Sequence, residues 1–141
     1  MVTLTTSGAP APCSSEGAPP FIERLKHLPG EAGQGEVSGR LVEVAAQALG
    51  FYEHSFPMIA ALFAEPALLA RHRRALAAHK AGHHKANELL AAYLRAEHDL
   101  GRVDAALDPE AGAALLLGAC FQRAFLAAFS GQRIDDGERS R

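Results

Sequence analysis

The segment that most constrains the fold of this 141-residue chain is its last predicted helix, which begins after Asp108 and ends near Phe129. Asp108-Pro109-Glu110 marks its start, since aspartate is a preferred N-cap and proline a preferred first helical residue. Apolar or small residues then occupy nearly every side: Ala113, Ala114, Leu115, Leu116, Leu117, Gly118, Ala119, Cys120, Phe121, Ala124, Phe125, Leu126, Ala127, Ala128 and Phe129. A helix that is apolar all round is normally buried all round. The remaining chain is too small to wrap it, so we expect one face to meet a second copy of the protein.

An amphipathic helix precedes this segment, and the two form a predicted C-terminal hairpin from Ala86 to Phe129. Leu89, Leu90, Tyr93, Leu94 and Leu100 are its expected buried positions. Gly101 is well placed to end it in the left-handed conformation that glycine adopts without strain.

Helical spacing of apolar residues predicts three further helices upstream, over 21–28, about 36–64 and 66–82. Pro57 lies inside the second and removes a backbone hydrogen bond, so we expect either a kink or two helices that meet near His54 to Phe56. No segment alternates apolar and polar residues as a half-buried strand does. The predicted fold class is therefore all-α.

Composition predicts one domain with two irregular ends. Residues 1–19 are rich in Ser, Thr, Gly, Ala and Pro and are predicted to be a disordered tail, 20–130 form the helical domain, and 131–141 are a frayed tail. The net charge of −2 gives no electrostatic reason to bind nucleic acid or an anionic membrane. Cys13 and Cys120 have no disulfide or metal-type spacing. Gln122 and Arg123 interrupt the longest apolar run, so we expect a cytoplasmic protein without a membrane segment.

The residues give little support for an enzyme or for a metal site. Cys120 lies in an apolar helix, where a thiol behaves as a small hydrophobe and its pKa rises. His79 and His83 have the i, i+4 spacing that can hold one ion, but Gly82 stands between them and no cysteine or carboxylate completes a ligand set. We predict no catalytic residue, no metal and no cofactor.

A small-molecule pocket near Pro57 is the better functional prediction, because such sites are mostly apolar with a few polar groups and often lie between helices. The predicted ligand-binding residues are Phe51, His54, Ser55, Met58, Leu62, His72, Leu76, Tyr93 and Phe121. For each residue taken singly, ordinary core packing is the alternative.

Two stretches resemble a known family. The run from Leu90 to Val103, followed by Asp108 to Gly118, resembles the C-terminal half of TetR-type bacterial transcriptional regulators, and Ala48 to Pro66 resembles earlier helices of that half. The resemblance covers roughly Pro20 to Phe129. It implies an effector-binding and homodimerisation domain whose last two long helices pack against their counterparts.

The predicted dimer interface combines small residues, which allow backbones to approach, with large apolar ones, which supply buried area. Its members are Leu94, Ala114, Leu115, Leu117, Gly118, Ala119, Phe121, Arg123, Phe125 and Leu126. Packing of all these residues within one subunit is the alternative.

The chain departs from the family at its N-terminus. Family members carry a helix-turn-helix domain there, whereas Met1 to Pro20 is too short and too rich in Pro and Gly to form one. We therefore expect a ligand-sensing dimer for an unknown apolar effector, with no direct DNA binding by this chain alone. The alternatives are a ligand-free helical protein that forms homodimers or mixed dimers with full-length regulators, and a histidine-based metal sensor.

Overall fold

The computed structural model describes residues 20–79 and 84–132, which form five α-helices and one 3-10 turn with no strand. These are α1 (Pro20–His27), η1 (Leu28–Glu31), α2 (Val37–Ala64), α3 (Pro66–Ala78), α4 (His84–Asp99) and α5 (Pro109–Ser130). The all-α prediction is confirmed. The predictions for the N-terminal tail, for Gly82 and His83, and for the end of the C-terminal tail lie outside the described residues.

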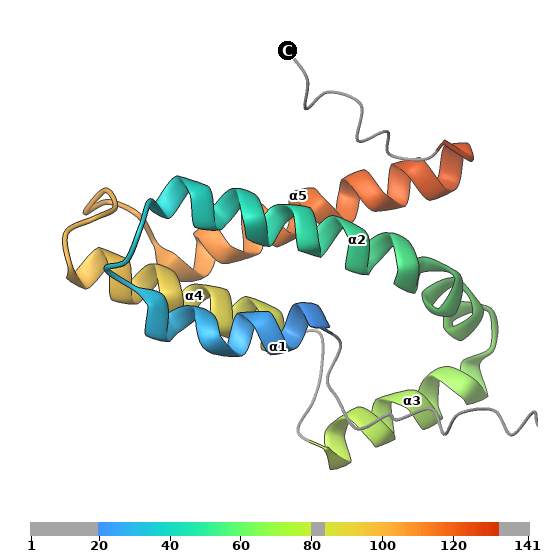
Figure 1. The fold of residues 1–141 in the computed structure, drawn as a ribbon. Coiled ribbons are helices and arrows are strands. Elements are labelled where there is room, and N and C mark those ends of the chain that lie inside the picture. Colours follow the sequence, from blue (N-terminus) through green and yellow to red (C-terminus); the bar gives the residue numbers. More distant parts are fainter. Residues whose placement is uncertain (1–19, 80–83, 133–141) are drawn as a thin grey trace, which may run out of the picture.

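Four helices form the core, and α3 is attached to one of them. Figure 1 shows α1, α4, α5 and the first part of α2 lying together, while α3 lies apart beyond the end of α2. The core side chains are Phe21, Leu25, Leu28, Val44, Ala48, Ala86, Leu90, Ala91, Tyr93, Leu94, Ala113, Leu117 and Cys120. No residue of α3 is buried. The side of α3 that faces the bundle is therefore free of tight packing.

Helix α2 continues through Pro57 as a single element of 28 residues. Of the two arrangements predicted for this stretch, two separate helices are not found, and Figure 1 shows the green C-terminal part of α2 turning away from the direction of its first turns. Just before the proline, the Ser55 hydroxyl donates a hydrogen bond to the Phe51 carbonyl oxygen at 2.7 Å. The change of direction carries α3 across the open side of the bundle.

The predicted C-terminal hairpin is confirmed, together with its two end signals, but Leu100 is 58% exposed and not buried as predicted, because α4 ends at Asp99. Gly101 has φ +71°, its N–H donates to the His98 carbonyl at 2.9 Å, and the N–H of Arg102 donates to the Glu97 carbonyl at 2.9 Å. This is the bonding pattern of a Schellman motif. At the start of α5, Asp108 Oδ1 accepts from the N–H groups of Glu110 at 3.0 Å and Ala111 at 3.3 Å.

Loss of the Asp108 cap is expected to have a measurable effect. Asp108→Ala should lower the free energy of unfolding by about 1 kcal/mol, because it leaves N–H groups of the first turn of α5 without their acceptor. Asp108→Asn is the matched control, since asparagine caps about as well as aspartate. Urea denaturation of both variants measures the difference. Equal losses in the two variants would contradict a role for the hydrogen bond.

The loop that follows η1 is fixed to the hairpin by a buried charge. Glu97 is fully buried, its Oε1 accepts from the Gly33 N–H at 2.9 Å, and its Oε2 lies 2.7 Å from Arg102 Nε. Arg102 also donates to the Gly33 carbonyl at 2.8 Å and to the Gly35 carbonyl. We call this group the Glu97–Arg102 clamp. Burial, and secondarily the neighbouring Glu97 carboxylate, raises the pKa of Tyr93 to about 12, so this buried phenol stays protonated.

Candidate functional site

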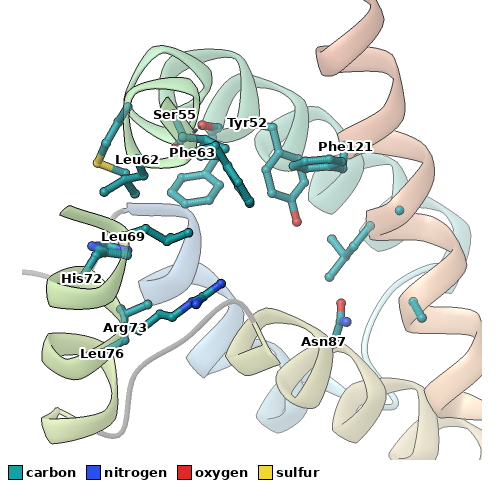
Figure 2. Close-up of a pocket in the computed structure, with 16 residues that line it drawn as sticks. Tyr52, Ser55, Leu62, Phe63, Leu69, His72, Arg73, Leu76, Asn87 and Phe121 are labelled. Carbon is teal, nitrogen blue, oxygen red and sulfur yellow. Dashed lines mark hydrogen bonds between the residues drawn. The ribbon is translucent and has the colours of Figure 1, made fainter. Parts of the chain in front are cut away.

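A cavity of about 510 Å³ lies between the second half of α2, α3, the first turn of α4 and the middle of α5 (Figure 2). Apolar side chains make up most of its wall. The lining residues are Phe51, Tyr52, Ser55, Met58, Ile59, Leu62, Phe63, Leu69, His72, Arg73, Leu76, Asn87, Ala114, Leu117, Gly118 and Phe121. Both the volume and the mainly apolar lining are typical of small-molecule sites.

Aromatic rings hold the α2 and α5 sides of the cavity together. The rings of Tyr52 and Phe121 have centroids 5.3 Å apart and meet edge to face at 83°. The Phe56 ring also packs against Phe121, with ring centroids 5.2 Å apart. Edge-to-face and tilted pairs of this kind are favourable arrangements for aromatic rings. The wall between α2 and α5 is therefore a preformed apolar surface.

A few polar groups interrupt this wall. The Ser55 hydroxyl is already bonded to its own helix. Figure 2 shows the Tyr52 hydroxyl, the Arg73 side chain and the Asn87 amide directed into the space from α2, α3 and α4. Burial raises the pKa of Tyr52 above its ordinary value, which keeps the hydroxyl a hydrogen-bond donor. Three donors from three helices thus face one apolar cavity.

The structure brings together seven of the nine residues predicted for the pocket. Phe51, Ser55, Met58, Leu62, His72, Leu76 and Phe121 line the cavity, whereas His54 and Tyr93 do not. His54 is exposed, because it lies to one side of the face of α2 that Phe51, Ser55 and Met58 share. Tyr93 is completely buried in the core, because α4 reaches the cavity only through its first turn, at Asn87. The predictions that His54 and Tyr93 line the pocket are wrong.

Several lining residues were not predicted from the sequence. They are Tyr52, Ile59, Phe63, Leu69, Arg73, Asn87, Ala114, Leu117 and Gly118. Arg73 is the most informative, since it is exposed overall yet borders the cavity. Leu69 stands four residues before it and Leu76 three residues after it, so helical spacing places all three on one side of α3. That signal was present in the sequence.

The outward face of α5 is a second candidate site. The core takes Ala113, Leu117, Cys120 and Ala124. On the opposite side lie Ala111, Leu115, Ala119, Gln122, Leu126 and Phe129, which we call the outward face of α5; all are exposed. Gly118 lines the cavity and lies at the border of this face. Leu115 is 74% exposed, Leu126 53% and Phe129 82%. An apolar face of this kind on a helix commonly marks a binding surface.

Two of the residues predicted for the dimer interface belong to the core instead. Leu94 and Leu117 are 3% and 2% exposed and pack inside this chain, because their positions on α4 and α5 turn toward the other helices. Ala114, Leu115, Gly118, Ala119, Phe121, Arg123, Phe125 and Leu126 are exposed. Their contact with a second copy stays a prediction.

Helix α5 is also long and apolar enough to cross a membrane, judged by length and composition only, and 22% of its most apolar stretch is buried. Gln122 and Arg123 interrupt the apolar run without lowering its average below that level. Such a helix is weak evidence for membrane insertion, because a helix at the core of a soluble protein has the same composition. The expected cytoplasmic location stays a prediction.

The histidines and the cysteine of the described chain form neither a metal site nor a reactive thiol site. Within residues 20–79 and 84–132, no group of three or more His, Cys, Asp or Glu side chains is arranged to hold a metal ion. The Cys120 thiol is buried, 3.7 Å from the Ala45 carbonyl oxygen, and burial raises its pKa as the sequence predicted. A raised pKa makes a thiol a poor nucleophile.

Comparison with protein-family models, with curated proteins and with solved structures finds no match to this chain. The resemblance to TetR-type regulators stays a prediction from the sequence.

Proposed function

We propose that this chain is the ligand-sensing and dimerisation domain of a TetR-like transcriptional regulator, with a small molecule bound in the cavity between α2, α3 and α5. The cavity itself carries the proposal: it has about 510 Å³, a largely apolar wall and a few inward polar groups. These are the features that separate a small-molecule site from an ordinary packing defect.

The position of α3 supports a sensing role. This helix contributes nothing to the core and packs on α2, while its residues Leu69, His72, Arg73 and Leu76 border the cavity. A molecule in the cavity would contact α3 on one side and Phe121 of α5 on the other. A ligand shifts a conformational equilibrium by its difference in affinity for the two states. In a complete regulator, the change would reach the DNA-reading domains through a dimer formed by α4 and α5.

The second candidate function is a helical dimer that needs no ligand and forms homodimers or mixed dimers with full-length regulators. The exposed, apolar outward face of α5 favours it. Both candidates use this face, and only the first uses the cavity. Filling the cavity therefore separates them.

Gly118→Leu is expected to abolish the stabilising effect of ligands. A Cβ at Gly118 would meet no atom within 4 Å, so the larger side chain can occupy the cavity without a clash at that atom. A compound at one hundred times its Kd stabilises the native state by about 2.7 kcal/mol. We expect a thermal-shift screen of lipophilic compounds to find such stabilisers for the unmodified chain and to lose them in the variant.

Gly50→Leu is the matched control, because Gly50 is also a helical glycine with open space at its Cβ and does not line the cavity. It should keep the stabilisation. Sedimentation of both variants separates an effect on the cavity from one on association. Failure of every lipophilic compound to stabilise a dimeric chain would favour the ligand-free function. A rise with zinc or nickel alone would favour a metal sensor.

A further inference from the structure

The described lining of the cavity carries a positive charge and no negative one. Arg73 is the one permanently charged residue among its lining side chains, and no aspartate or glutamate is among them in the described chain. None of the ion pairs between described residues involves Arg73. The cavity therefore offers a cation without a carboxylate partner on its wall.

Two neutral side chains that can donate hydrogen bonds line the same cavity as that cation. In Figure 2 the Arg73 side chain extends from α3 toward the middle of the cavity, and the Asn87 amide and the Tyr52 hydroxyl point into the same space from α4 and α2. The arginine has five N–H donors and no acceptor, and the amide can donate two more hydrogen bonds. Next to these groups lie the aromatic and aliphatic walls formed by Phe121, Leu117 and the apolar side chains of α2.

We infer that the ligand of this cavity is a singly charged amphiphilic anion, with a carboxylate at Arg73 and an apolar body against α2 and α5. This inference rests on the proposed function and names the ligand class for the same site. A guanidinium binds a carboxylate through two parallel hydrogen bonds, which would fix the head group at Arg73 while the apolar body lies against the wall. One cation balances one negative charge, and the neutral Tyr52 and Asn87 side chains can donate hydrogen bonds without adding charge, which favours a carboxylate over a doubly charged phosphate.

Titration calorimetry with the full chain and three probes of equal chain length tests the inference. The probes are decanoate, decanol and decyltrimethylammonium, each below its micelle concentration. We expect decanoate to bind at least tenfold more tightly than decanol, a difference of about 1.4 kcal/mol. The cationic probe should bind more weakly than both, because it meets the like charge of Arg73.

Arg73→Gln should weaken decanoate binding about tenfold and leave decanol binding unchanged. Arg73→Lys should restore part of the preference, because it returns the charge without the planar fork. Arg71→Gln is the matched control: it removes the same charge from the same helix, at an exposed position that does not line the cavity. It should change decanoate affinity by less than about twofold.

Two results would contradict an anionic ligand. Equal binding of the three probes, or a decanoate affinity that Arg73→Gln leaves unchanged, would overturn the anionic ligand and leave the proposed sensing of apolar molecules in place. Absence of binding by all three probes would overturn both.

Discussion

Arg102→Met is expected to lower the free energy of unfolding by about 2–4 kcal/mol. Glu97 is fully buried and has two kinds of partner, the Gly33 N–H and the Arg102 guanidinium. Removal of one member of a buried ion pair leaves the other charge in a low-dielectric site, which typically costs about 3–5 kcal/mol. The Arg102 side chain is 31% exposed, so water can reach part of the site and the expected loss is about 1 kcal/mol smaller than that range.

The arginine also holds backbone groups in place. Its guanidinium donates to the carbonyl oxygens of Gly33 and Gly35, whose φ angles of +86° and +65° belong to the left-handed region. Methionine can fill the volume of the arginine stem but donates to neither carbonyl. The loop before α2 should therefore lose protection against amide hydrogen exchange along with the loss of global stability.

Arg95→Met is the control for the clamp. Arg95 pairs with Glu110 at the surface, where both side chains are more than half exposed. Exposed pairs of this kind contribute about 0–1 kcal/mol. Urea denaturation of both variants measures the contrast. Losses of similar size would show that the Glu97 carboxylate gains little from Arg102.

The helices and their ends followed from local rules, which explains why they were predictable. Asp108 accepts bonds from the first turn of α5, and Gly101 takes the left-handed conformation after α4, as expected. These features depend on a few neighbouring residues. The spacing of Phe51, Ser55, Met58 and Leu62 likewise placed them on one side of α2, and the structure brings them to one cavity.

The features that were missed depend on contacts between distant segments. Glu97 lies four residues after Tyr93 and three after Leu94, so helical spacing places it on the buried face of α4, but the Gly33 N–H that bonds its carboxylate is 64 residues away. Tyr93 was placed in the pocket because its hydroxyl suggested a ligand contact, but α4 reaches the cavity only at Asn87 and Tyr93 is buried in the core. Sequence periodicity gives the face of a helix and leaves open which neighbour covers it.

The outward face of α5 gives the prediction with the largest effect. We expect the chain to sediment as a dimer at micromolar concentration and Leu126→Glu to convert it to a monomer. Leu126 is 53% exposed and lies on a face that includes Leu115 and Phe129 and no charged residue. A twofold dimer carries the substitution twice, so two glutamates would enter an apolar contact. A loss of at least about 4 kcal/mol corresponds to roughly a thousandfold rise in Kd.

Val42→Glu is the control for this substitution, because Val42 is 67% exposed and lies on α2, away from the outward face of α5. It should leave the chain dimeric. Both variants should keep the helical content of the unmodified chain, since neither position belongs to the core. Leu126→Glu should lower the melting temperature, because it removes the stabilisation that association provides. A monomeric unmodified chain would contradict the dimer. Flotation with neutral lipid vesicles would then test whether that monomer binds lipid instead. If the unmodified chain floated with the vesicles and Leu126→Glu did not, the outward face of α5 would be a lipid-binding surface. In that case lipid would cover the apolar area that a second copy covers in the dimer.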